Sequence, residues 1–391
     1  MPNLVGIGNS QVPTNGMLGG LAYQDSSVLD QVRSGRKNMI INGAMNICQR
    51  FAVNTANNIS NATHTYHVDR FKAYESTDAI LQGEWLNSDA PSGFYNSLFY
   101  HPVGTDTTLA NEQFGFISQV IELNNMRHLG YGGSYAKTCT LSFYVKSNVT
   151  GTFCIALLND GTNNRGFVTE YTIDSANTWE RKVITIPGDT SGTWSSNGLR
   201  IAWTLVSSGN RHTTTVGSWF TDSTVRYATN KQVNFMSSAS NSFKITGVQF
   251  ETGNYATDFE HRSYAEELKL CQRYYAIFHP CTQAQIYIES GGTATHSFWE
   301  GPVPQGMRAE PSVTLSGTWT GHNIAGGRSI SAVAVQGIDN GGNAGTTHPG
   351  SMGAVSLRVT RDTSGTYSDR DVVHHDGWGN GNAWIAFESE L

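Results

Sequence analysis

The chain has 391 residues, a formal net charge of −6 and only 14% charged residues, well below the share of about 25% in an average soluble domain. Its 42 glycines exceed the usual share of about 7%. This composition indicates short strands joined by many turns, and the negative net charge provides no basic surface for nucleic acid. We therefore expect a mainly β protein without a nucleic-acid partner.

Residues 1–37 contain few large apolar side chains and show no periodicity, so we expect an extended arm that lies against another protein. The first residues lack the basic region and apolar segment of a secretory signal, and no stretch has the roughly 18–20 apolar residues of a membrane helix. We therefore expect synthesis in the cytoplasm without a signal peptide, and no membrane insertion. The odd number of cysteines, without C-x-x-C spacing, argues against a zinc site or a complete disulfide framework.

The strand signal is steady from about residue 38 to residue 260. Residues 140–147 alternate Leu141, Phe143 and Val145 with polar neighbours, as expected for a half-buried strand. Further candidate strands, separated by Gly, Asn, Asp or Ser, are "GTFCIALLN", "FVTEYTI", "ERKVITI", "GLRIAWTLV", "KQVNFMSS" and "SFKITGVQFETG". Since no helical segment separates these strands, the pattern predicts an antiparallel jelly-roll β-sandwich over residues 38–278.

An aromatic-rich stretch interrupts this series at residues 86–104. The stretch follows Trp85 and contains Phe94, Tyr95, Phe99 and Tyr100. The stretch is interpreted either as a hairpin over the core or as the wall of a groove, and both interpretations stay open from the sequence.

One segment has helical spacing. Ser263 and Glu266 form a capping-box pair, and Tyr264, Leu268, Cys271 and Tyr275 recur on one helical face. The pattern predicts a helix over 263–275 that closes the sandwich. Its outer face would carry Lys269, Gln272 and Arg273.

Residues 279–391 return to short strands separated by long glycine-rich loops. The candidate strands are "AQIYIES", "THSFWEG", "PSVTLSGTW", "RSISAVAVQGI", "GAVSLRVTRD" and "NAWIAFESEL". A unit of this size with so few core residues would be only marginally stable alone. We therefore expect a smaller β-rich distal domain and association between copies of the chain.

Several segments in this order carry a family resemblance: "KNMIINGAMNICQRF", "YHVDRFKAYE", "FISQVIE", "TLSFYVKS" and "ITGVQFETGNYATDFEHRSYAEELKLCQRYY". Together they resemble a module of tailed-bacteriophage tail fibres and related virion proteins, a jelly roll similar to carbohydrate-binding modules. Residues 303–317 and 383–391 look like the short tip domain that follows it, and the N-terminus looks like the docking arm of marine-phage virion proteins. The resemblance implies a virion protein, a homotrimer, and an arm that binds other virion proteins.

The polar residues that match this module are interpreted as structural. Asp69 and Arg70 can form a charge-assisted pair at a strand start. Glu260, His261 and Arg262 precede the capping residues Ser263 and Glu266 and are predicted to form a buried polar cluster that pins the helix, with ligand contact as the alternative. Gln49, Arg50, Gln119 and Glu122 are expected to be further network members.

The distal domain offers the candidates for chemistry. Asp371, His374 and Asp376 are weak candidates for a metal site, with a polar strand as the simpler interpretation. No phosphate-binding motif or nucleophile elbow is found, and paired carboxylates for glycoside cleavage cannot be assigned. We therefore expect a protein that is not an enzyme and has no cofactor.

Aromatic side chains near short polar residues in the distal loops favour sugar recognition. The candidate ligand-binding residues are Trp378, Trp299, Tyr367, His348 and Asp376. Trp319 and Trp384 are interpreted instead as filling a trimer core. The sequence thus predicts attachment to a host-surface glycan or protein through the distal domain. The alternatives are a connector or head decoration without host contact and, third, a polysaccharide hydrolase.

Overall fold

The computed structural model describes residues 36–59, 62–162, 164–195, 197–221 and 224–278 in the first two thirds of the chain. Beyond them it describes residues 296–302, 306–309, 311–316, 321–323, 326–328, 330–339, 354–361, 372–373 and 384–390. The N-terminal arm predicted for residues 1–37 lies outside the described residues, apart from its last two.

Contacts divide the chain into two units. The first comprises Met1–Asn46, Val53–His67 and Phe71–Arg262, and the second comprises Ile47–Ala52, Val68–Arg70 and Ser263–Leu391. Two short pieces from the start of the chain thus belong to the second unit, and so does the helix predicted at 263–275.

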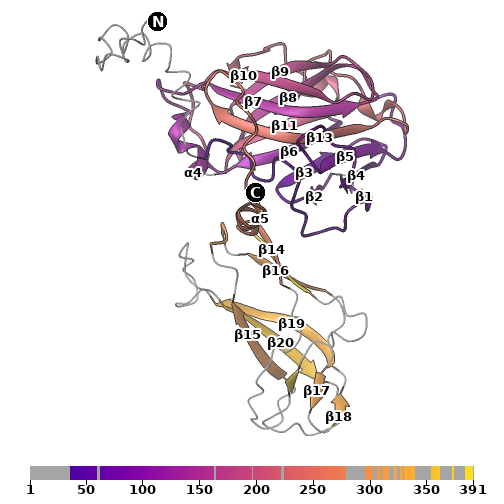
Figure 1. Cartoon of the computed structure of the whole chain (residues 1–391), viewed down its shortest axis with the longest axis vertical. Coiled ribbons are helices and arrows are strands. Elements are labelled where there is room, and N and C mark those ends of the chain that lie inside the picture. Colours follow the sequence, from indigo (N-terminus) through magenta and orange to yellow (C-terminus); the bar gives the residue numbers. More distant parts are fainter. Residues whose placement is uncertain are drawn as a thin grey trace, which may run out of the picture. The chain divides into compact units, whose positions relative to one another are not determined.

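The first unit contains two antiparallel sheets (Figure 1). The six-stranded sheet has the order β1 (Asn57–Asn58), β4 (Leu81–Leu86), β5 (Ser97–Pro102), β13 (Phe243–Thr252), β7 (Cys139–Ser147) and β10 (Glu180–Ile186). The seven-stranded sheet has the order β12 (Trp219–Phe220), β9 (Gly166–Ile173), β8 (Gly151–Asp160), β11 (Gly198–Ser207), β6 (Phe114–Ile121), β3 (Phe71–Glu75) and β2 (His64–Val68). The predicted antiparallel jelly-roll sandwich is therefore confirmed.

The core lies between these sheets. Phe143 of β7 meets Trp203 of β11 edge-on, with ring centroids 5.8 Å apart, and Phe153 of β8 meets Phe243 of β13 at 5.7 Å. All four side chains are fully buried. These large rings join the two layers, because each strand turns alternate side chains to the same face.

One predicted strand is wrong. The segment "KQVNFMSS" contains the short 3₁₀ helix η3 (Phe235–Ser237), and the Asn234 side chain caps it by accepting a hydrogen bond from the Met236 amide. Phe235 and Met236 are consecutive and both buried, whereas a half-buried strand turns consecutive residues to opposite faces. Three short helical turns were also not predicted, namely α4 (Leu123–Met126), η1 (Arg127–Leu129) and η2 (Gly209–Arg211).

The predicted helix is present in the second unit as α5 (Tyr264–Gln272). The Ser263 hydroxyl accepts a hydrogen bond from the Glu266 amide at 3.4 Å, so the predicted N-cap is confirmed. The predicted end at 275 is wrong, because Tyr275 begins strand β14 (Tyr275–Phe278). Of the predicted face, Cys271 and Tyr275 are buried as expected, whereas Tyr264 is 65% exposed. Glu267, which was not assigned to that face, is also buried.

The described residues of the second unit otherwise form antiparallel strands in three small sheets (Figure 1). The first sheet has the order β14, β22 (Trp384–Glu388) and β16 (Ser312–Ser316). The second has β15 (His296–Pro302), β20 (Ala354–Arg361) and β19 (Ile330–Asp339), and the third has β18 (Gly326–Arg328), β17 (Gly321–Asn323) and β21 (Val372–Val373). Five of the six predicted distal strands coincide with these elements, and "AQIYIES" lies outside the described residues.

No helix in the described part of the chain combines the length and apolar character needed to cross a lipid bilayer.

Candidate functional site

The ligand-binding residues predicted in the distal domain remain predictions. Trp299 belongs to strand β15, but its side chain lies outside what the structure describes. Trp378, Tyr367, His348 and Asp376 lie outside the described residues, and so do the metal candidates Asp371 and His374. Within the described residues, no group of three or more His, Cys, Asp or Glu side chains is placed to hold a metal ion.

The structure places Asp69 and Arg70 in an ion-pair cluster of the second unit. Asp69 lies 3.5 Å from the Nη1 atom of Arg50 and accepts hydrogen bonds from the Gln49 amide and side chain at 3.1 and 2.5 Å. Arg70 pairs with Glu390, and its guanidinium carbon lies 3.4 Å from the ring centroid of Tyr274. These contacts join the start of the chain to its last residues.

Burial and opposite charge act against each other in this cluster. Burial lowers the pKa of Arg50, but Glu390, Asp69 and Glu388 raise it more, so the guanidinium stays charged. Burial raises the pKa of Asp69 to about 6 despite the attraction of Arg50. Both side chains are thus held by named partners within the second unit.

The first unit ends with Glu260, His261 and Arg262. Hydrogen bonds with this end of the unit hold residues 37–40. The Glu260 carboxylate accepts hydrogen bonds from the amides of Lys37 and Asn38 at 2.8 and 2.7 Å. Burial raises the pKa of Glu260, but these amides, together with the charge of Arg262 and a hydrogen bond from Arg36, outweigh it and lower the pKa overall. Arg262 donates to the Ile40 carbonyl at 3.1 Å. The His261 ring lies 4.8 Å from that of Phe259.

A second set of side chains lies together on the outer face of the six-stranded sheet. Cross-strand pairing places Glu84 opposite Phe99, Phe99 opposite Lys244, and Lys244 opposite Lys146. Directly opposed residues of antiparallel strands point to the same face, so these four form one row across β4, β5, β13 and β7. We call the surface formed by Gln82, Glu84, Phe99, His101, Tyr144, Lys146 and Lys244 the polar–aromatic face; each of these side chains is half-buried.

Two of its rings are stacked. Phe99 and His101 lie with centroids 5.2 Å apart and planes 22° apart. The Nζ atom of Lys244 lies 5.0 Å from the centroid of Phe99, within the range of a cation–π contact. Leu98 and Tyr100, which alternate with these residues on β5, are fully buried in the core. The strand therefore supports a half-exposed ring pair on a rigid base.

The loop between β4 and β5 reaches onto this face through Asp89. Its carboxylate accepts hydrogen bonds from Lys146 Nζ at 2.7 Å, from Trp179 Nε1 at 3.2 Å, and from Lys244. Burial raises the pKa of Asp89, but the hydrogen bonds from Lys146 and Lys244 outweigh it and lower the pKa to about 2. The carboxylate is therefore charged at neutral pH and bridges the two lysines.

The same loop is anchored by Phe94. Its ring lies 5.4 Å from that of Tyr144 and 5.0 Å from that of Phe259. A Cβ atom at Gly247 would lie only 2.7 Å from the Phe94 ring, so the glycine provides the space that the ring occupies. The neighbouring Tyr95 is 84% exposed. Residues 86–104 thus contain the loop between β4 and β5 together with strand β5, and the loop covers part of the outer face.

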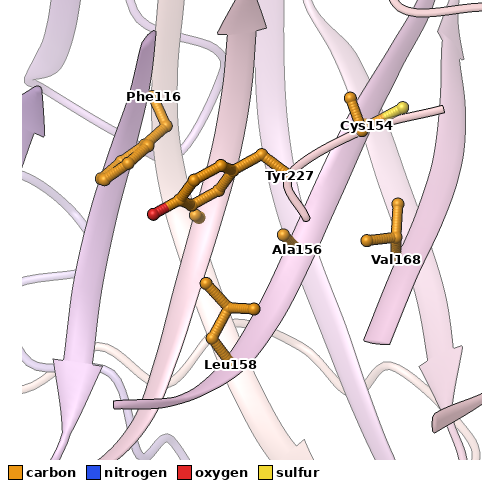
Figure 2. Packing of buried hydrophobic residues seen from close by; sticks show 8 residues of the cluster. Phe116, Cys154, Ala156, Leu158, Val168 and Tyr227 are labelled. Carbon is orange, nitrogen blue, oxygen red and sulfur yellow. The ribbon is translucent and has the colours of Figure 1, made fainter. Parts of the chain in front are cut away.

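The corresponding face of the seven-stranded sheet is occupied by its own chain. Phe116, Ala156 and Leu158 pack there in a buried cluster with Tyr227, and Figure 2 shows the Tyr227 ring lying across the strands beside Phe116. The centroids of these two rings are 4.9 Å apart. Because the polar–aromatic face keeps half-exposed rings beside polar groups, it is the better candidate site.

This face combines groups that bind sugars. A half-exposed ring offers a flat apolar surface, while amide, carboxylate and ammonium groups can bind hydroxyl groups. Its residues are separated by up to 162 positions, from Gln82 to Lys244 (244 minus 82). The aromatic content of residues 86–104 indicated a possible groove, but no sequence signal linked it to Lys146, Trp179 or Lys244.

No protein-family model matches the sequence, and a search of curated proteins finds no match. Among solved structures, the enzymatically active domain of tailspike protein 4 from bacteriophage CBA120 aligns with 11% identity over 50% of this chain, with a TM-score of 0.27, and only 21% of the tailspike chain is covered. A family 11 carbohydrate-binding module from a cellulosomal cellulase of Clostridium thermocellum aligns with 17% identity over 52% of this chain and 100% of the module, with a TM-score of 0.26. A cyclase from Fischerella sp. TAU aligns with 10% identity over 57% of this chain and 99% of the cyclase, with a TM-score of 0.30.

Proposed function

We propose that this chain is a virion appendage protein of a tailed phage, and that its first unit binds glycans of the host surface through the polar–aromatic face. The observation that carries the proposal is the stacked, half-exposed pair Phe99 and His101 beside Lys244 and Gln82. The phage role is supported by the resemblance of several sequence segments, within this sandwich and at its two ends, to those of fibre proteins. The proposal assigns binding rather than catalysis to the chain.

The proposed mode of binding follows from the geometry of the face. The apolar side of a sugar ring would lie on Phe99 and His101, while Gln82, Glu84 and Lys244 would bind its hydroxyl groups. One such contact is weak, because a shallow surface buries little of the ligand. Several copies in one particle would raise the total affinity through their high effective concentration. We therefore propose that the chain forms a homotrimer and that its N-terminal arm attaches it to other virion proteins.

The distal domain enters the proposal as a second contact with the host. Its predicted residues, Trp378, Trp299, Tyr367 and His348, have the side chains that sugar recognition uses. A receptor contact there and a glycan contact on the sandwich are compatible, and variants of each surface distinguish them.

The test is a glycan-array screen of the full-length protein, followed by titration of the best glycan with Phe99→Ala and His101→Ala. We expect each substitution to lower affinity about tenfold, which corresponds to about 1.4 kcal/mol. Tyr95→Ala is the matched control, since it removes an aromatic ring that is 84% exposed. The loop should keep its place in this variant, because the neighbouring Phe94 still contacts Tyr144.

Three results are informative. Loss of binding in Phe99→Ala but not in Tyr95→Ala supports the proposed site. Unchanged binding in Phe99→Ala and His101→Ala, with loss in Trp378→Ala, would move the site to the distal domain. A full-length protein that binds no glycan and does not compete with the phage for host cells would refute the proposal.

A purely structural virion role is the second candidate. It is favoured by Ile80 and Val103, which are 45% and 48% exposed and are joined by a 2.7 Å backbone hydrogen bond. Exposed apolar side chains next to each other suit a contact with another protein. Cross-linking from an Ile80→Cys variant in intact particles tests this role: a cross-link to another virion protein supports it, and a side chain that reacts freely with a solvent-borne maleimide argues against it.

A further inference from the structure

Three donors converge on the carboxylate of Asp89, and none of them comes from the loop that carries it. Lys146 lies on β7, Lys244 lies on β13, and Trp179 lies between β9 and β10. The sheet fixes the positions of the two lysines, because Lys146 and Lys244 are directly opposed in register. The donor geometry therefore belongs to the sandwich, and the loop only supplies the acceptor.

The two lysines need an anion between them. Like charges directly opposite each other on neighbouring strands repel, and here the Lys146 and Lys244 side chains are only 22% and 18% exposed. Asp89 supplies the anion in the free protein, and its side chain is 31% exposed. A carboxylate from solution could therefore reach the same position once the Asp89 side chain turns away.

We propose that this triad of donors is a subsite for the carboxylate of an acidic sugar, and that Asp89 is an internal occupant that the ligand displaces. Lys244 links the subsite to the rest of the polar–aromatic face, because its Nζ atom also lies 5.0 Å from the ring centroid of Phe99. A uronic acid whose ring lies on Phe99 would direct its carboxylate toward Lys146, Lys244 and Trp179. The inference rests on the proposed glycan-binding function and specifies its ligand class.

The charges on the face determine the direction of the effect. Lys146 and Lys244 are balanced by Asp89 and Glu84, so the four side chains together carry no net charge. Asp89→Asn keeps the shape of the side chain and leaves a net charge of +1 (two positive, one negative). Glu84 stays in the row beside Phe99, and its negative charge favours neutral sugars there. The discrimination between acidic and neutral sugars therefore depends on the position that Asp89 vacates.

The experiment uses the full-length chain and two probes: an oligogalacturonate and its methyl-esterified form, in which esterification removes the negative charges. We expect Asp89→Asn to raise affinity for the acidic probe about fivefold, since it removes both the competitor and a repulsive charge. Affinity for the methyl ester should stay the same. Lys146→Met added to Asp89→Asn should return affinity for the acidic probe to the wild-type level or below it.

Two outcomes overturn the inference. In the first, Asp89→Asn binds the acidic probe no better than the wild type does. In the second, its gain persists in the double variant with Lys146→Met, which would show that the gain does not depend on the Lys146 ammonium group. Phe99→Ala separates this inference from the proposed function: if it weakens binding of the neutral ester while Asp89→Asn changes nothing, glycan binding stands and the carboxylate subsite does not.

Discussion

Arg50 lies over the ring of Tyr275, with its guanidinium carbon 3.5 Å from the ring centroid. The same guanidinium is within 3.2 Å of Glu388 and 3.4 Å of Glu390. Arg50 thus contacts Tyr275 in strand β14, Glu388 at the end of β22, and Glu390 just beyond it. All of these residues belong to the second unit. This relationship makes Arg50 the centre of the ion-pair cluster.

Replacement of Arg50 by Met should therefore destabilise the second unit strongly. The side chain of Arg50 is 11% exposed, and those of Asp69 and Glu390 are 1% and 6% exposed. Removing one member of a buried ion pair leaves an uncompensated charge, which costs about 3–5 kcal/mol. Urea unfolding followed by circular dichroism measures the loss. Arg36→Ala is the control, because Arg36 is 60% exposed in its pair with Glu260 and should cost less than about 1 kcal/mol. Equal losses would contradict the role given to Arg50.

Trp203 should be the most sensitive position of the sandwich core. Its ring contacts Phe143 from the opposite sheet and Phe71 from its own, and it is fully buried. Trp203→Ala should lower the free energy of unfolding by about 3–5 kcal/mol, because it leaves a cavity between the layers. Tyr95→Ala should change it by less than about 0.5 kcal/mol. A thermal-shift comparison of the two variants is sufficient, and similar melting temperatures would count against the assigned core.

Gly198 and Gly217 should respond differently to alanine, although both have positive φ, at 97° and 71°. A Cβ atom at Gly198 would lie 2.1 Å from the Ile121 carbonyl oxygen, whereas nothing lies within 4 Å of one at Gly217. Gly217→Ala should cost about 1–2 kcal/mol from backbone strain alone. Gly198→Ala adds a backbone clash where β11 begins and should cost about 2–5 kcal/mol. Denaturant unfolding compares them, and a smaller loss for Gly198→Ala would show that the start of β11 adjusts.

The loop over the polar–aromatic face should open in acid. The pKa of Asp89 is lowered from 3.8 to about 2, since the hydrogen bonds from Lys146 and Lys244 outweigh the effect of burial. A depressed pKa means that the contribution of the ion pair is complete above about pH 4 and is lost as the pH falls toward 2. The indole of Trp179 donates to Asp89 and can report the change. We expect the difference in fluorescence between the wild type and Trp179→Phe to titrate between pH 4 and 2, and to be flat over that range in Asp89→Asn.

The sequence predicted what depends on neighbours in the chain. The alternation of Leu141, Phe143 and Val145 defined a strand, because side chains of a strand point to opposite faces in turn. Ser263 marked the start of a helix, because an N-cap needs only its own side chain and the next turn. The helical spacing of Tyr275 was misleading, since pairing with Glu388 in β22 places it in a strand.

The tertiary structure alone decided which charges meet and which rings are accessible. Two partners of Arg50, Glu388 and Glu390, are 338 and 340 residues away in the chain, and no local pattern specifies such distant pairs. The polar–aromatic face depends on the registers of β4, β5, β13 and β7, which are fixed by side chains packed in the core rather than by the half-exposed residues themselves. Chain-local chemistry therefore determined the strands and the helix start, whereas long-range packing determined the candidate site.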